Sequence, residues 1–254
     1  MRTGLPDTIA PLGERLRRED PERFALIMLA PPDTRARLVT LYALNAELSR
    51  TALAARDPLI AEMRVQWWVE RLEALRSGPP PPHELLSPLW SAWGGAAGAF
   101  AALAEARRHD AVREPFPDIA AVVAYADATR GALMVHAART LGADEVPALR
   151  AQGRGAALVA WLRAQPALQP LGLGLARPDA QALASLARIA LRAFRDATDG
   201  RRTLPRAAAP VLFPGPAPRR FLNALAAGQR PPEPSDFTRR AALARFSLTG
   251  RWWV

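Results

Sequence analysis

The stretch that most constrains the fold of this chain is residues 35–76. Apolar residues recur there at the three- and four-residue steps of an amphipathic helix, interrupted once at Asp57-Pro58. Aspartate is a common N-cap and proline is tolerated at the first helical position, so this dipeptide predicts the start of a second helix. Gly78 is the expected stop. The positions predicted to point inward are Leu38, Leu41, Tyr42, Leu44 and Leu48 in the first helix, and Ile60, Met63, Trp67, Leu72 and Leu75 in the second.

The rest of the chain also predicts helices. Alanine and leucine dominate, glycine and proline punctuate, and almost no alternating pattern is present, so the expected class is all-α. Apolar helices of similar composition flank the prolines of residues 79–82, which predicts a loop inside one domain covering residues 1–254. The expected N-caps are Asp118 and Ser235, and the expected stops are Gly142, Gly200 and Gly228. Helices are expected near residues 8–18, 21–30, 33–55, 58–77, 83–110, 118–141, 145–165, 178–199, 218–227 and 236–249.

Composition excludes several classes of protein. Half of the 254 residues are hydrophobic, which suffices for a sizeable core. No apolar run reaches the roughly 18 residues that a membrane-spanning helix needs, and residues 1–20 lack the apolar segment of a secretory signal. The chain contains no cysteine, which excludes a disulfide framework and a thiolate metal site. These features predict a cytoplasmic protein.

The charge is distributed unevenly. Every basic residue is an arginine; residues 1–128 hold 15 of them against 17 acidic residues, and residues 129–254 hold 19 against 7. Such asymmetry is typical of a protein with an anionic partner: a diphosphate, an anionic membrane face, an acidic protein or nucleic acid. The other interpretation is a GC-rich genome that encodes arginine in place of lysine on solvated helix faces. No nucleic-acid-binding motif is present, so we expect no nucleic acid partner.

The last residues, FTRRAALARFSLTGRWWV from Phe237 onward, combine arginines with two tryptophans. Basic amphipathic helices with tryptophan anchors lie on anionic membranes, which would make the protein peripheral at the inner membrane. Alternatively, the apolar side chains of this segment pack on the helical bundle. The second interpretation is favoured, and both hold if they concern different faces. The side chains expected to pack are Phe237, Leu243, Phe246 and Leu248.

Several segments resemble one protein family. LYALNAELSR followed by RDPLIAEMRVQWWVERLEAL is similar to the squalene/phytoene synthase family, and more narrowly to its divergent branch that includes the mitochondrial complex I assembly factor and bacterial relatives. The resemblance resumes over residues 125–142, 153–166 and 247–253. It implies a single-domain helical bundle of the isoprenoid-synthase type with about ten helices.

The same resemblance implies a chemistry that can be checked against the acidic residues. Family members remove a diphosphate, and Mg²⁺ held by two DxxxD motifs on facing helices neutralises it; carboxylates four residues apart share a helix face. Among the 24 acidic residues only Asp110/Glu114 and Glu114/Asp118 have this spacing. Pro115 and Pro117 forbid a continuous helix there. No helix of this chain is therefore expected to offer such a pair.

The positions that correspond to the family motifs lack most of the metal ligands. The first retains only Glu47, and the second, after Leu162-Arg163, contains no carboxylate, so we expect neither catalysis nor a bound metal. Two interpretations are open for the polar residues that remain. They form a metal-free pocket for a phosphorylated lipid or prenyl diphosphate, or Arg64 and Arg130 form buried ion pairs with Glu47, Glu62 or Asp127; the second is favoured. The cavity residues implied by the resemblance are Glu47, Arg64, Gln66, Tyr125, Arg130 and Arg163.

These observations lead to three functional hypotheses. The first is a non-catalytic family member that takes part in respiratory complex I assembly through contacts with complex I subunits, assembly intermediates or a membrane surface. The second is an Mg²⁺-dependent prenyltransferase, which convergence of Glu47, Asp127 and Asp196 on one cavity would favour. The third is a metal-free isoprenoid or lipid carrier. Other catalytic motifs are absent, and His83, His109 and His136 lie far apart in the sequence.

Overall fold

A computed structural model describes residues 5–55 and 57–254, which divide into two compact units, Met1–Arg113 and Glu114–Val254. The first four residues of the segment expected to lack a secretory signal lie outside the described part. The expected single domain over residues 1–254 stays a prediction. None of the described helices has the length and apolarity needed to cross a lipid bilayer.

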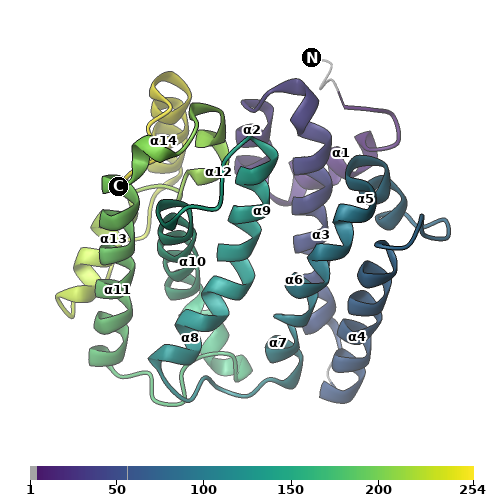
Figure 1. Cartoon of the computed structure of the whole chain (residues 1–254). Helices are drawn as coiled ribbons and strands as arrows, with labels where there is room; N and C mark the ends of the chain where they lie inside the picture. The colour runs from purple at the N-terminus through teal and green to yellow at the C-terminus, as the bar shows by residue number, and fades with distance from the viewer. Residues whose placement is uncertain (1–4, 56) are drawn as a thin grey trace. The chain divides into compact units, whose positions relative to one another are not determined.

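The regular secondary structure in the described part of unit 1 is helical (Figure 1). Its elements are α1 (Ala10–Glu19), α2 (Pro21–Met28), the short 3₁₀ helix η1 (Pro32–Thr34), α3 (Arg35–Ala54), α4 (Pro58–Ala74), α5 (Leu86–Trp93), the 3₁₀ helix η2 (Gly94–Phe100), α6 (Ala101–Glu105) and α7 (Arg108–Val112). The single helix expected over residues 83–110 is wrong. Gly94 has a φ of 55°, a left-handed conformation that suits glycine, and α5 ends there. The chain continues as η2, α6 and α7.

The junction between α3 and α4 confirms the predicted helix start. The Asp57 carboxylate accepts a hydrogen bond of 2.9 Å from the backbone N–H of Leu59, and Pro58 is the first residue of α4. The inward face predicted for α3 is also confirmed, because all five of its apolar side chains are buried.

The inward face predicted for α4 is partly wrong. Leu72 and Leu75 are buried, but Ile60, Met63 and Trp67 are exposed. Apolar residues cover more than one face of this helix, and the face that packs follows steps of four and three residues. That buried face consists of Ala61, Val65, Trp68, Leu72 and Leu75.

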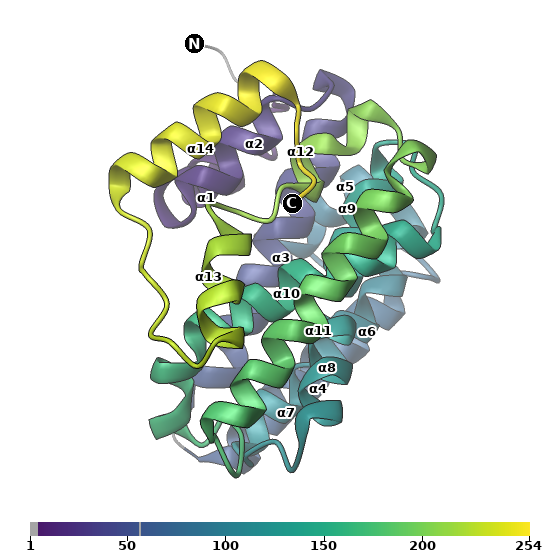
Figure 2. The same cartoon turned by 90° about the vertical axis from the view of Figure 1, so that its left-hand side faces the viewer.

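Unit 2 surrounds the long helix α10 (Figures 1 and 2). Its elements are α8 (Ile119–Ala126), the π-helical turn η3 (Asp127–Gly131), α9 (Ala132–Thr140), α10 (Pro147–Leu168), the 3₁₀ helix η4 (Gln169–Leu171), α11 (Ala180–Asp199), the 3₁₀ helices η5 (Arg201–Thr203) and η6 (Arg206–Ala208), α12 (Ala209–Leu212), α13 (Pro218–Ala226) and α14 (Asp236–Thr249). An isolated parallel bridge joins Phe116 to Leu175. The expected N-caps are confirmed: Asp118 accepts from the N–H of Ala121 and Ser235 from that of Thr238.

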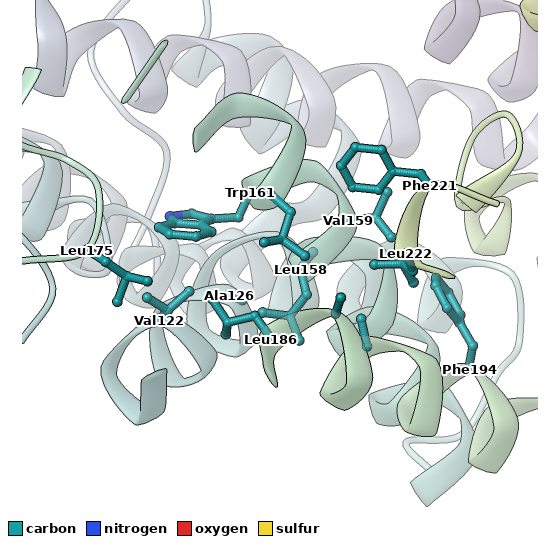
Figure 3. Packing of buried hydrophobic residues seen from close by; sticks show 14 of the residues in the cluster. Val122, Ala126, Leu158, Val159, Trp161, Leu175, Leu186, Phe194, Phe221 and Leu222 are labelled. Atoms are coloured by element: carbon teal, nitrogen blue, oxygen red, sulfur yellow. The ribbon is translucent and has the colours of Figure 1, made fainter. Parts of the chain in front are cut away.

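Helix α10 supplies the centre of the unit 2 core. Leu158, Val159 and Trp161 project from it, and side chains from α8, α11 and α13 pack around them (Figure 3). The helix extends three residues beyond its expected end at Gln165. Pro166 removes one N–H donor, but its fixed φ is helical, so the helix ends only after Leu168.

Small residues let α10 approach the π-helical turn η3. A Cβ placed on Gly153 would lie 3.1 Å from the carbonyl oxygen of Gly131 and 3.2 Å from its Cα. Only glycine at residue 153 permits this approach of two backbones without displacement. The segments that contain these glycines are two of those that resemble the synthase family. The turn η3 also interrupts the single helix expected over residues 118–141.

Helix α14 packs on the rest of unit 2 through one face only. Phe246 is buried, with its ring 4.9 Å from that of Phe213, and Leu243 is half-buried. The expectation that Phe237 and Leu248 also pack is wrong, because 82% and 87% of their surfaces are exposed. Because Phe213 lies between α12 and α13, this ring contact joins α14 to the segment that precedes α13.

Candidate functional site

The candidate site in unit 1 is a pocket of about 500 Å³ lined by Glu47, the residue that the resemblance places at the first acidic motif. Helix α3 lines it with Glu47, Arg50, Thr51 and Ala54, and α4 lines it with Arg64, Trp67 and Trp68. Both sets follow the three- and four-residue spacing that places side chains on one helix face. His83 completes the lining from the loop that precedes α5.

Two arginines neutralise the carboxylate of Glu47. Arg50 Nη2 donates to Glu47 Oε2 at 2.6 Å and Arg15 Nη2 donates to the same oxygen at 2.9 Å. Arg50 also donates to Glu19 at 2.8 Å, which extends the network to α1. Partial burial raises the pKa of Glu47, but the hydrogen bonds and charges of Arg50 and Arg15 outweigh it and hold that pKa below its ordinary value of 4.5. Glu47 is therefore the centre of an ion-pair network.

Aromatic side chains form the opposite wall of the pocket. Trp68 is buried and its indole N–H donates to the hydroxyl of Thr51 at 3.1 Å. The rings of Trp67 and Trp68 meet edge to face with centroids 5.0 Å apart, and both lie within 6 Å of His83, at 5.8 and 5.7 Å. His83 Nδ1 accepts hydrogen bonds from the backbone N–H groups of Leu85 and Leu86, so a neutral His83 carries its proton on Nε2.

Arg64 is the cation of the pocket that has no acidic partner. Its side chain is exposed, and among the described residues it makes neither an ion pair nor a side-chain hydrogen bond. The expected ion pair with Glu47 or Glu62 is therefore wrong, because Arg15 and Arg50 already hold Glu47.

Gln66 lies on another face of α4. Its side-chain amide donates to Glu70 at 3.0 Å and its carbonyl oxygen accepts from Arg108 at 2.8 Å. Residues two apart on a helix do not face the same side, so Gln66 does not accompany Arg64 into the pocket.

The remaining cavity residues implied by the sequence belong to unit 2. The ring of Tyr125 packs against Phe116 with centroids 5.2 Å apart. Arg130 is exposed on η3. Arg163 Nη2 donates to the carbonyl oxygen of Pro216 at 2.6 Å, and its guanidinium lies 5.0 Å from the centre of the Phe221 ring. Arg163 thus ties α10 to the segment before α13.

Asp127 is paired with an arginine that the sequence-based hypotheses do not include. Arg154 Nη2 lies 2.6 Å from Asp127 Oδ2, and Arg154 Nε donates to both carboxylate oxygens at 3.0 Å. This bidentate contact joins η3 to α10, and the expected ion pair of Arg130 stays a prediction. Asp196 and Asp199 are exposed on α11.

The donors present do not fit the magnesium cluster of a prenyl synthase. Such a cluster needs several oxygen ligands, chiefly carboxylates. Within each unit, the described residues form no group of three or more His, Asp or Glu side chains able to hold a metal ion. Glu47 would have to leave two arginines before it could bind a cation, and no carboxylate follows Arg163 in the last turns of α10.

Several residues that shape the pocket are absent from the sequence-based site, among them Arg15, Arg50, Thr51, Trp68 and His83. The spacing of Thr51, four residues after Glu47, and of Trp68, four after Arg64, would have identified two of them. Arg15 and His83 come from distant parts of unit 1, and only the tertiary structure brings them to the pocket.

The ion pairs of Glu47 predict a pH-dependent stability. A carboxyl group whose pKa is lowered by folding stabilises the folded state above its unfolded pKa, and this contribution is lost as the pH falls through the folded pKa. We expect Glu47→Gln to lower the free energy of unfolding by about 1 kcal/mol at neutral pH, and by progressively less below pH 4.5. Urea denaturation of both proteins from pH 7 to acid would measure this. A difference that does not change with pH would contradict it.

Comparisons with known proteins agree with this geometry. The family model for squalene/phytoene synthase matches residues 16–167. "NADH dehydrogenase (ubiquinone) complex I, assembly factor 6" of Rattus norvegicus is 25% identical over 175 residues, which cover 64% of this chain and 51% of the relative. The protein of the same name from Homo sapiens is 25% identical over 165 residues, covering 60% and 48%. The chain thus spans about half the length of these curated relatives.

A solved structure shows the same fold. The crystal structure of a dehydrosqualene synthase in complex with ligand matches with a TM-score of 0.73 at 13% sequence identity, and the match covers 94% of each chain. This identity supports the all-α isoprenoid-synthase fold alone. The family model covers more than half of the chain and includes α3, α4 and most of α10. The chain belongs to the squalene/phytoene synthase family.

Proposed function

We propose that this protein is a non-catalytic member of the squalene/phytoene synthase family that takes part in the assembly of respiratory complex I. The observation that carries the non-catalytic part is the state of Glu47. The one carboxylate at the first motif position is bound by Arg15 and Arg50, and the second motif position has none. A diphosphate leaving group needs cations to neutralise its charge, and within each unit the described residues form no carboxylate cluster that could hold them.

The complex I part of the proposal is supported by the relatives. Rat and human proteins named as complex I assembly factors match over 175 and 165 residues. Within the family the proposed role is binding rather than prenyl transfer, with complex I subunits or assembly intermediates as the partners.

Release of diphosphate tests the non-catalytic part. The protein would be incubated with Mg²⁺ and farnesyl or geranylgeranyl diphosphate, and released diphosphate would be measured beside a heat-denatured sample. We expect no release above that background. Release that Glu47→Gln abolishes would overturn the proposal and establish the prenyltransferase alternative.

Loss of the protein in its own host tests the complex I part. We expect NADH–quinone activity of the membranes to fall and partly assembled complex I to accumulate on native gels. Complementation by Glu47→Gln should restore both, because the proposed role needs no catalytic carboxylate. Normal complex I levels without the protein would contradict this part of the proposal.

A metal-free prenyl or lipid-binding function is the second candidate, and Arg64 favours it. An exposed guanidinium without an acidic partner among the described residues stands beside two tryptophans in a cavity of about 500 Å³. Arginine binds phosphate groups, and aromatic walls suit an apolar chain. Calorimetry with farnesyl diphosphate in the absence of metal would show binding that Arg64→Gln weakens and Arg18→Gln, an exposed arginine of α1, does not. Absence of binding would exclude this function.

A further inference from the structure

Helix α14 presents an apolar stripe that no part of the described chain covers. Phe237 and Leu248 are 82% and 87% exposed. They are eleven residues apart, which places them within about 20° of one another around an α-helix. The exposed Ala241 and Ala244 fall between them on the same face, opposite the buried Phe246. The stripe therefore runs along most of the helix, and the contact with unit 2 through Phe246 and Phe213 uses the other side.

Arginines border this stripe on both sides. At 100° per residue, Arg240 lies roughly 60° to one side of Phe237 and Arg245 roughly 80° to the other. Arg245 also lines a cavity of about 290 Å³, together with Arg219 and Arg251. Trp252 and Trp253 line the same cavity, so the apolar stripe continues into a basic, aromatic surface.

Few acidic residues accompany the arginines near the C-terminal end of the chain. Residues 200–254 contain ten arginines and two acidic residues. Among the described residues, no arginine from Arg177 onward belongs to an ion pair. Arg201 and Arg251 instead lie 5.8 and 5.6 Å from the centre of the Trp253 ring. Such a surface is complementary to an anionic bilayer: the apolar stripe suits the acyl chains, and the uncompensated cations and tryptophans suit the headgroup region.

We propose that α14 and the basic cavity beside it bind the surface of an anionic phospholipid bilayer. The helix lies in the plane of the interface with Phe237 and Leu248 inserted among the acyl chains, while Arg240 and Arg245 contact phosphate groups. Arg219 and Arg251 bind a further headgroup in the cavity. The proposal rests on the surface of unit 2 and is independent of the proposed function.

Cosedimentation with vesicles tests the apolar half of the proposal. We expect the full chain to bind vesicles of phosphatidylcholine with phosphatidylglycerol and not those of phosphatidylcholine alone. Leu248→Ser and Phe237→Ser should each weaken binding about tenfold, because each removes a side chain that is buried only in the bilayer. Leu171→Ser is the matched control, since Leu171 is 53% exposed on η4, outside the stripe. It should bind like the unmodified protein.

Removal of charge tests the basic half. Arg240→Gln and Arg245→Gln should each weaken binding to the anionic vesicles roughly fivefold, and added salt should weaken it further. Arg177→Gln controls for net charge, because Arg177 is exposed before α11 and belongs neither to α14 nor to the lining of the basic cavity. Far-ultraviolet circular dichroism verifies that each variant folds. Absence of binding to anionic vesicles, equal binding to neutral ones, or equal effects of the stripe and control variants would overturn the proposal.

Discussion

Replacement of Trp68 by alanine is expected to lower the free energy of unfolding by about 3–5 kcal/mol. Only 5% of Trp68 is exposed, and its ring fills the space between α3 and the loop that carries His83. The substitution removes this packing together with the hydrogen bond from its indole N–H to Thr51. Urea denaturation followed by far-ultraviolet circular dichroism would measure the loss.

The neighbouring tryptophan is the matched control. Trp67 is 38% exposed, and its contacts are the edges of Trp68 and His83 and the guanidinium of Arg71. Trp67→Ala should cost about 1 kcal/mol, because such ring contacts contribute little beyond the area they bury. Equal losses for both variants, or a larger loss for Trp67→Ala, would show that α4 buries the face predicted from the sequence.

The second large effect is expected at Gly153. Replacement of glycine by alanine inside a helix normally stabilises it by about 1 kcal/mol. At Gly153 we expect the opposite sign, a loss of about 1 kcal/mol for alanine and about 3 kcal/mol for valine. The added Cβ would meet the backbone of Gly131, which cannot move aside as the end of a side chain can. Thermal and urea unfolding would measure the series.

Ala167→Val supplies the control for this series. Ala167 lies on the same helix α10 and is exposed, so a β-branched side chain there meets no backbone. Its cost should stay within the few tenths of a kcal/mol that the lower helix propensity of valine implies. A stabilising Gly153→Ala would contradict the close contact between α10 and the π-helical turn.

The pocket of unit 1 and the basic surface of unit 2 are proposed to bind different ligands. In unit 1, Glu47 is part of an ion-pair network, while Arg64 makes no ion pair among the described residues. In unit 2, α14 and the cavity beside it carry uncompensated arginines next to apolar side chains. The diphosphate, calorimetric and vesicle experiments therefore give independent answers.

Local features of the sequence determined much of the fold. The caps at Asp57, Asp118 and Ser235 form as predicted, because a side chain and the N–H groups that follow it are neighbours along the chain. The spacing of the acidic residues likewise excluded an aspartate-rich pair on any helix, since proline and i, i+4 geometry are local properties. The family was identified from the segment RDPLIAEMRVQWWVERLEAL and from the segments that contain Gly131 and Gly153.

The tertiary structure decided which faces and partners these local elements use. Periodicity left more than one apolar face on α4 and on α14; neighbours distant in sequence buried Trp68 and Phe246, and left Trp67 and Phe237 exposed. The tertiary structure also decided which arginines form ion pairs with Glu47. Arg64 is closer in sequence to Glu47 than Arg15 is, yet the packing of α1 on α3 brings Arg15 to the carboxylate. Burial and ion pairing depend on distances in space, and spacing along a helix specifies only which side chains share a face.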